Sequence, residues 1–188
     1  EVEDEVEDEV TDEDEDEVTD NNVKTWGAKG DGKTDDTIAF NKILESSIKE
    51  VYIPAGTYIV DGLSIPSNKV FKGEGKTKSI IKLKNNYGYG LIIINNGSNI
   101  TITDLTLDAN RDGGTGGHCI RIAGCNNVNI KNCNIKNGDH YNIGAQVGIM
   151  KDLIIDNCVL EGSGADGIDI KNKEDKNSGI RITNITVN

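Results

Sequence analysis

The chain has 188 residues, only 4% of them aromatic, and a formal net charge of −12. Residues 1–22 contain all of this excess, because the other 166 residues carry 18 acids against 20 bases. A folded part so close to neutrality excludes the basic footprint of a nucleic-acid-binding protein. No stretch approaches the ~20 apolar residues of a membrane-spanning helix, so we expect neither nucleic acid nor a membrane as a partner.

Residues 1–22 form an acidic segment with 14 Asp and Glu and no Lys or Arg. A run of like charges without aromatic residues cannot bury enough apolar surface to fold, so we predict a disordered acidic linker. Its carboxylates could attract Ca²⁺, although no spacing in it fixes a coordination geometry, and no other cofactor is expected. Residues 23–188 are long enough for a single domain.

The first element expected in this domain is an amphipathic helix. Residues 34–37, Thr-Asp-Asp-Thr, supply an N-cap and two acids for the first turn, and residues 38–48 follow with an apolar stripe. The stripe consists of Phe40, Ile43, Leu44 and Ile48. We expect Asp31, Asp35 and Asp36 to have this capping role rather than a catalytic one.

Strand patterns follow the helix. Residues 50–60 are typical of a strand, a turn and a second strand, and residues 70–75 with 79–83 predict another unit of the same kind. An open end of stacked strands exposes unpaired backbone and apolar side chains, and the preceding helix is suited to cover it.

A six-residue pattern then returns four times, at intervals of 25 to 28 residues. Its first, fourth and sixth residues are aliphatic or Cys, and its third is Asp or Asn, the residue types that best tolerate a left-handed bend. Such a period predicts an all-β, right-handed parallel β-helix, a solenoid whose coils stack with an Asn ladder at one corner. The chain ends at Asn188 directly after a strand pattern, so we expect the domain to be truncated at its C-terminus. The copies are Ile102–Leu107, Ile130–Ile135, Ile155–Leu160 and Ile182–Val187.

Three segments at the start of the domain resemble the pectate lyase superfamily, in its rhamnogalacturonase and epimerase-like branch: Val23–Thr37, Val51–Tyr58 and Phe71–Gly75. The resemblance implies the pectin-lyase-like β-helix, a scaffold shared by pectinolytic lyases, family 28 glycosidases, uronate epimerases and phage tail spikes. It favours an extracellular carbohydrate-active protein that acts on an acidic polysaccharide such as pectin or polygalacturonate. Two alternatives stay open: a non-catalytic glycan-binding or tail-spike-like module, on a virion and trimeric, and a structural spacer.

Chemistry on such a scaffold is expected where side chains of successive coils line up on the outside, about 4.8 Å apart. Aligning the inward Ile120, Ile143 and Ile168 predicts two outward rows, and imidazole, phenol, guanidinium and carboxylate groups in such rows can bind uronates and move protons. Ordinary solvent-facing polarity at strand edges is the alternative. The rows are His118, Tyr141 and Asp166, and Arg121, Gly144 and Asp169.

We assign roles to these residues and their neighbours as hypotheses. The catalytic candidates are Asp166, His118 and Asp169. The substrate-binding candidates are Arg121, Asp139, His140, Tyr141 and Lys171.

Two motif resemblances bear on these roles. Ala165–Ile170 and Gly117–Ile122 are similar to the Asn-Thr-Asp-Gly and Gly-His-Gly motifs of family 28 glycosidases, which implies catalytic roles for Asp166 and His118, although the order of the motifs is reversed here. A glycosidase needs two carboxyls roughly 5–9.5 Å apart. Asp166 and Asp169 have odd spacing on one strand, which places them on opposite faces, so we expect the partner carboxyl beyond the end of this chain.

Residues 141–146 align with the Tyr-Gly-Phe-Asp-Pro-His motif of alginate epimerases. Tyr141 matches the motif, whereas Gly144 and Gln146 stand where it has Asp and His. The resemblance therefore extends to the strand but not to the whole catalytic set.

Four cysteines complete the candidates. Cys133 and Cys158 occupy the same inward position of adjacent coils, which predicts stacked buried thiols, with a disulfide as the alternative. His118, Cys119, Cys125 and His140 lack the spacing of a zinc site, so no metal is expected.

Overall fold

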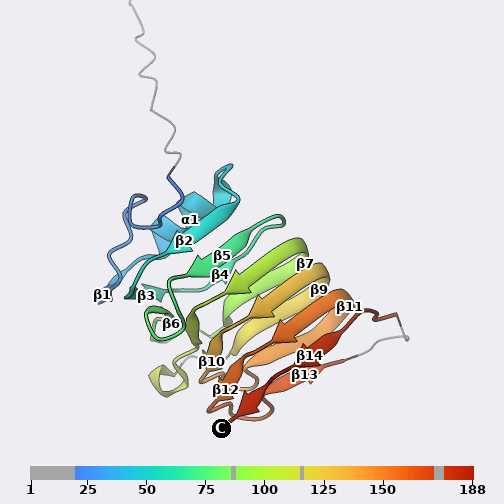
Figure 1. Ribbon diagram of the computed structural model, residues 1–188. Helices are drawn as coiled ribbons and strands as arrows, with labels where there is room; N and C mark the ends of the chain where they lie inside the picture. Colours follow the sequence, from blue (N-terminus) through green and yellow to red (C-terminus); the bar gives the residue numbers. More distant parts are fainter. Residues whose placement is uncertain (1–19, 86–87, 115–116, 172–175) are drawn as a thin grey trace, which may run out of the picture.

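A computed structural model describes residues 20–85, 88–114, 117–171 and 176–188, and most of the expected acidic linker lies outside them. The described chain winds into a parallel β-solenoid whose coils stack along one axis (Figure 1). Every strand pair is parallel and joins successive coils, which confirms the predicted right-handed parallel β-helix. None of the described helices has the length and apolar character that a membrane crossing requires.

Two sheets form the walls of the solenoid. The first is seven-stranded and contains β1 (Asp31–Asp35), β3 (Gly56–Val60), β6 (Ser79–Leu83), β8 (Thr106–Asp108), β10 (Asn134–Lys136), β12 (Val159–Glu161) and β15 (Thr186–Val187). The second is eight-stranded and contains β2 (Glu50–Ile53), β4 (Leu63–Ser64), β5 (Val70–Gly73), β7 (Gly90–Thr103), β9 (His118–Lys131), β11 (Ile143–Asp156), β13 (Ile168–Ile170) and β14 (Arg181–Thr183).

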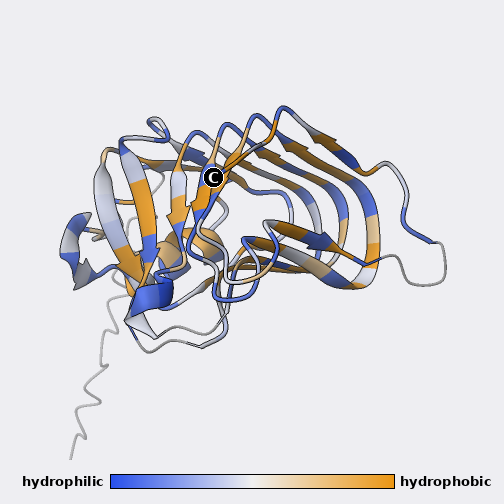
Figure 2. Ribbon diagram, turned by 90° about the horizontal axis from the view of Figure 1, so that it is seen from below, coloured by the Kyte–Doolittle hydropathy of each residue, from blue (hydrophilic) through white to orange (hydrophobic). Residues whose placement is uncertain are grey.

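The core consists of aliphatic side chains that stack from coil to coil. The first residues of the four repeats pair in register, with Ile102 opposite Ile130, Ile130 opposite Ile155, and Ile155 opposite Ile182. Alternation along each strand sends Ile102, Ile130 and Ile155 inward, where they are buried, whereas Ile182 in the last coil is exposed. Figure 2 shows hydrophobic residues along the strands and hydrophilic ones at many of the bends. Cys133 and Cys158 are buried free thiols in this core, so the stacked-thiol arrangement holds.

An amide ladder fixes the corner between the two sheets. The third residues of the repeats all have positive φ, between 49° and 60°. The Asn132 amide donates to Asp104 Oδ1 at 3.2 Å, and the Asn157 amide donates to Asn132 Oδ1 at 2.8 Å. Asn184 departs from the prediction, because its amide donates instead to Asp156 Oδ1.

A second ladder lies within the eight-stranded sheet. The Asn99 amide donates to Asn68 Oδ1 at 3.0 Å, and the Asn127 amide donates to Asn99 Oδ1 at 2.9 Å. All three residues have positive φ. The bend at these residues divides each long strand into two segments. The candidate site lies on the first segment of each strand.

Replacing Asn132 with alanine should lower the free energy of unfolding by about 2–3 kcal/mol, because the change removes two amide hydrogen bonds and puts alanine at φ 52°. Urea denaturation followed by circular dichroism measures the loss. Asn126→Ala is the matched control, since Asn126 is exposed on β9, the strand that precedes Asn132, and should change stability by less than about 0.5 kcal/mol. Equal effects of the two substitutions would contradict a stabilising ladder.

The helix α1 (Thr37–Glu45) packs at the N-terminal end of the stack (Figure 1). Phe40, Ile43 and Leu44 are buried as expected, and the Phe40 ring meets Tyr58 edge-on with 5.5 Å between ring centres. Ile48 lies beyond the helix but still packs against the core. The helix is thus the predicted cap.

The capping role expected for the acids is wrong in detail, because no acid lies in the first turn. Asp31 and Asp35 belong to β1, and the helix begins only at Thr37, whose N–H donates to Asp35 Oδ1 at 3.0 Å. The Asp36 side chain points towards the preceding loop, where its carboxylate accepts hydrogen bonds from the N–H groups of Lys29 at 2.6 Å and of Gly30 at 3.1 Å. Asp36 therefore occupies the N-cap position but holds the entry loop with its side chain, and Asp35 accepts the first N–H of the helix.

Asp31 should make stability depend on acidic pH. The N–H groups of Thr34 and Lys33 donate to its carboxylate and lower its pKa from 3.8 to about 2. The unfolded chain therefore takes up this proton first, so the stabilisation is full above about pH 5 and is lost progressively as pH falls through 3.8 towards 2. Urea midpoints measured between pH 5 and pH 2 should fall less steeply in Asp31→Asn than in the wild type, and parallel slopes would contradict this account.

Candidate functional site

The structure aligns one of the two predicted rows of candidate residues across β9, β11 and β13. Ile143 pairs with Ile120 and with Ile168, and Gly144 pairs with Arg121 and with Asp169. Ile120 and Ile143 are fully buried, whereas Arg121 and Asp169, at the next position of their strands, are partly exposed. The row of Arg121, Gly144 and Asp169 therefore lies as the sequence alignment of coils predicts.

An aromatic and imidazole cluster lies where these strands begin. The His118 ring stacks on Tyr141 with 5.1 Å between ring centres and 24° between planes. His140 approaches His118 edge-on at 5.9 Å and lies 6.3 Å from Tyr141. The structure thus brings three of the sequence-predicted residues into one cluster.

Gly144 makes room for this cluster. A Cβ atom at Gly144 would lie only 3.2 Å from the His118 ring, closer than ordinary van der Waals contact. The imidazole therefore occupies the space above residue 144 that a side chain would otherwise fill. The packing of the His118 ring therefore explains why residue 144 is a glycine, and the sequence alone does not reveal this contact.

His118 is held as a neutral imidazole. Burial lowers its pKa below 6.5, the nearby His140 and Arg121 lower it further, and Asp169 opposes them. Its Nδ1 atom is buried and has no hydrogen-bond partner among the described residues. A neutral imidazole at pH 7 can accept a proton from a bound molecule.

Arg121 presents its guanidinium to the same face. Its Cζ atom lies 5.1 Å from the centre of the Tyr89 ring, and Nη1 is 3.5 Å from Asn95 Oδ1. Tyr89 is half exposed, and it precedes Gly90, which pairs with His118. Sequence reasoning missed Tyr89, and aligning residues 88–94 with the later coils would have found it.

The carboxylates are distributed unevenly over this face. Asp169 accepts a hydrogen bond from the Gln146 amide and lies 3.9 Å from Lys171 Nζ. Asp139 Oδ2 lies 3.9 Å from His140 Nδ1. Asp166 is exposed, and no described residue is bonded to its carboxylate. The structure therefore joins Asp169 with Lys171 and leaves Asp166 outside the contacts of the cluster.

Metal ligands do not gather around these residues. Within the described parts of the chain, no group of three or more His, Cys, Asp or Glu side chains could hold a metal ion. Cys119 and Cys125 are buried, and burial raises the pKa of both thiols. The described side chains of this face offer imidazole, phenol, guanidinium, ammonium and carboxylate groups.

Comparisons with known proteins agree with this architecture. Residues 21–188 match the family model described as rhamnogalacturonase A/epimerase, pectate lyase-like. The pre-neck appendage protein of Bacillus phage phi29 is 33% identical over 177 residues, which cover 78% of this chain and 21% of that protein. Alginate lyase 7 of Azotobacter vinelandii is 39% identical over 109 residues, covering 48% of this chain and 13% of that protein.

A solved structure, ORF18 of Geobacillus virus E2, has the same fold, with a TM-score of 0.75 and 21% identity over 86% of this chain and 35% of that one. The chain spans only about a fifth of the length of the phage relative, so these likenesses describe the scaffold and not a whole protein. The family match covers nearly all of the described β-helix. The chain therefore belongs to the rhamnogalacturonase A/epimerase, pectate lyase-like family.

Proposed function

We propose that this chain is a carbohydrate-active β-helix that binds and cleaves an acidic polysaccharide, of the pectin or polygalacturonate kind, on the outer face of β9, β11 and β13. The observation that carries the proposal is the stacked pair of His118 and Tyr141 beside the guanidinium of Arg121. Relatives that include an alginate lyase support a polysaccharide as the substrate class.

The face has the parts needed to hold a uronate. Half-exposed Tyr89 and the ring of Tyr141 offer apolar faces to sugar rings, and Arg121 can pair with a carboxylate through two N–H groups. Lys171 adds a second cation two coils further, beside Asp169. A polymer with regularly spaced carboxylates suits such a row of cations.

The geometry supports elimination better than hydrolysis. Neutral His118 can take the proton next to the sugar carboxylate while Arg121 stabilises the charge that develops there. The C–O bond to the next sugar then breaks, a C=C bond forms, and the Tyr141 hydroxyl gives its proton to the leaving oxygen. Hydrolysis would require Asp166 and Asp169 as acid and base, and Asp169 is already engaged by Gln146 and Lys171.

A second candidate is a non-catalytic glycan-binding or phage-appendage module. Gly144 and Gln146 support it, because they replace the Asp and His of the alginate-epimerase motif. The phage pre-neck appendage relative supports it too. For such a module we propose a virion location and assembly as a homotrimer. On this account the aromatic cluster binds sugar without turnover.

Incubation with pectin, polygalacturonate, rhamnogalacturonan and alginate tests both candidates. New reducing ends together with unsaturated uronate absorbance would establish elimination, and reducing ends alone would establish hydrolysis. Asp166→Ala should abolish hydrolysis but leave most of an elimination activity, whereas Glu50→Ala, an exposed acid on β2, should change neither. Retention on a polymer without turnover would favour the binding module, and no retention would refute both.

A further inference from the structure

A second charged region lies on the seven-stranded sheet, away from the face of β9, β11 and β13. Lys82 pairs in register with Ile59 on one side and with Asp108 on the other, and Lys136 pairs with Asp108 in the next coil. These residues form an outward row across β3, β6, β8 and β10. Opposite charges in such a row would be expected to neutralise one another.

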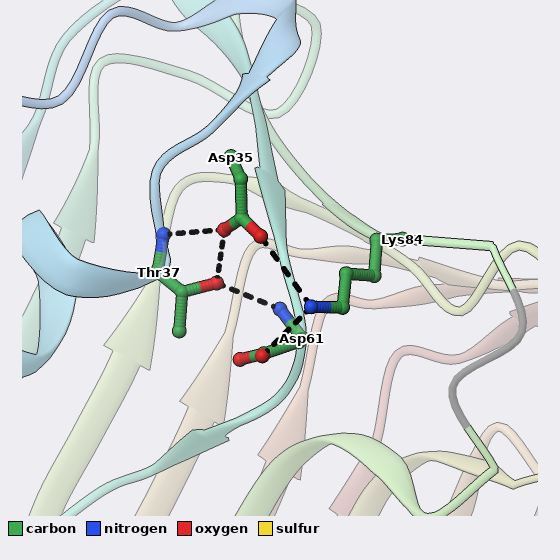
Figure 3. A network of polar contacts seen from close by, with 4 residues as sticks. All are labelled: Asp35, Thr37, Asp61 and Lys84. Atoms are coloured by element: carbon green, nitrogen blue, oxygen red, sulfur yellow. Dashed lines mark hydrogen bonds and ion pairs between the residues drawn. The ribbon is translucent and has the colours of Figure 1, made fainter.

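Lys84, next to this row, is fully neutralised (Figure 3). Its Nζ lies 2.8 Å from Asp61 Oδ2 and 3.4 Å from Asp35 Oδ2. Asp35 also accepts the Thr37 N–H, and the Thr37 hydroxyl accepts the N–H of Asp61 at 3.0 Å. Both carboxylates therefore pair with Lys84, and the Asp35 carboxylate and the Asp61 N–H also bind Thr37 at the start of α1.

Asp108 is committed as well, but in the direction away from Lys82. Its Oδ1 accepts the Asn137 amide at 2.8 Å and the Asn110 N–H at 2.9 Å, and its Oδ2 lies 3.6 Å from Lys136 Nζ. Asp108 is buried, so these contacts fix its orientation. Lys82 consequently loses the partner that the register places beside it.

A hollow of about 300 Å³ opens at this point. No described carboxylate lies within 4.0 Å of the ammonium groups of Lys33 or Lys82. Two ammonium groups without a carboxylate partner among the described residues, those of Lys33 and Lys82, therefore line a concave surface, with the ion-paired Lys84 beside them. The lining residues are Gly32, Lys33, Ile59, Lys82, Leu83, Lys84, Asn85 and Asn110.

We propose that this hollow is a binding site for an oxyanion, a carboxylate, sulfate or phosphate group. Lys33 and Lys82 supply ammonium donors without competing carboxylates, and Lys84 is held rigidly at the rim by Asp61 and Asp35. A concave site focuses the field of its cations more strongly than a flat surface does. The site lies on a different sheet from the proposed catalytic face, so it stands or falls independently of the proposed function.

Titration of the ¹⁵N-labelled chain with inorganic phosphate, sulfate and galacturonate, at constant ionic strength, tests the site. We expect saturable shifts of the Lys33, Lys82 and Asn85 amide signals, and the anion that binds most tightly identifies the group. Lys33→Ala/Lys82→Ala should weaken binding at least tenfold, and this change removes no described ion pair.

Lys72→Ala is the matched control, because Lys72 is exposed on β5 of the other sheet and should leave binding unchanged. Shifts that rise linearly without saturation for all three anions would overturn the proposal. Equal affinity in the double variant and the control would overturn it too, since binding would then not depend on the hollow.

Discussion

Replacing Lys69 with methionine should lower the free energy of unfolding by about 3–5 kcal/mol, although the substitution keeps the length and apolar stem of the side chain. Only 6% of Lys69 is exposed, and burial lowers the pKa of its ammonium. Its Nζ donates to the carbonyl oxygens of Ser46 at 2.9 Å and of Ile48, and lies 3.4 Å from that of Ile43.

These carbonyls lie at and just beyond the end of α1, where backbone acceptors have no partner within the helix. Methionine would leave the Ser46 and Ile48 oxygens without this donor, whereas the Ser46 hydroxyl would still donate to Ile43. Because α1 covers the end of the solenoid, its loss would also expose the rings of Phe40 and Tyr58. The whole first coil therefore depends on one ammonium group.

Urea denaturation measures this effect, with Lys72→Met as the matched control. Lys72 is an exposed lysine three residues further along the same segment, and its substitution should change stability by less than about 0.5 kcal/mol. A loss below 1 kcal/mol for Lys69→Met would mean that water reaches the carbonyls after the ammonium is removed. In that case water could replace the Lys69 ammonium as the hydrogen-bond donor to these carbonyls.

The sequence is sufficient to predict the coils because their register depends on backbone geometry. An inward residue such as Ile130 has to stack on Ile102 and Ile155, and Asn132 is one of the few residue types that accept the bend between them. These constraints recur at a fixed period, so a single sequence shows them. The cap helix was recognisable for the same reason, from its apolar stripe.

Contacts that depend on side-chain direction were not predictable in this way. The second ladder through Asn99 lies inside a long strand, where no six-residue pattern marks it. The sequence gives no sign that Asp108 turns towards Lys136, or that Gln146 binds Asp169. Alignment of coils places residues at the same level, but packing decides which of them touch.

The largest functional effect is expected from His118→Gln, which should lower kcat/KM on the cleaved polymer by about 10²–10⁴-fold. Glutamine retains hydrogen-bonding groups but cannot take up a proton near neutral pH. Because the pKa of His118 is lowered below 6.5, the wild type should keep its activity down to mildly acidic pH and lose it as the imidazole becomes protonated. The variant should lack this acidic limb.

Two further variants distinguish proton transfer from packing. His140→Gln changes the other imidazole of the cluster and should cost less than tenfold, because His140 approaches His118 only edge-on. Gly144→Val should reduce activity as strongly as His118→Gln, since a Cβ 3.2 Å from the ring displaces the imidazole while leaving it chemically intact. Unchanged activity in Gly144→Val would show that His118 does not act from its position above this glycine. Equal losses in His118→Gln and His140→Gln would mean that the cluster serves to bind the polymer rather than to transfer a proton.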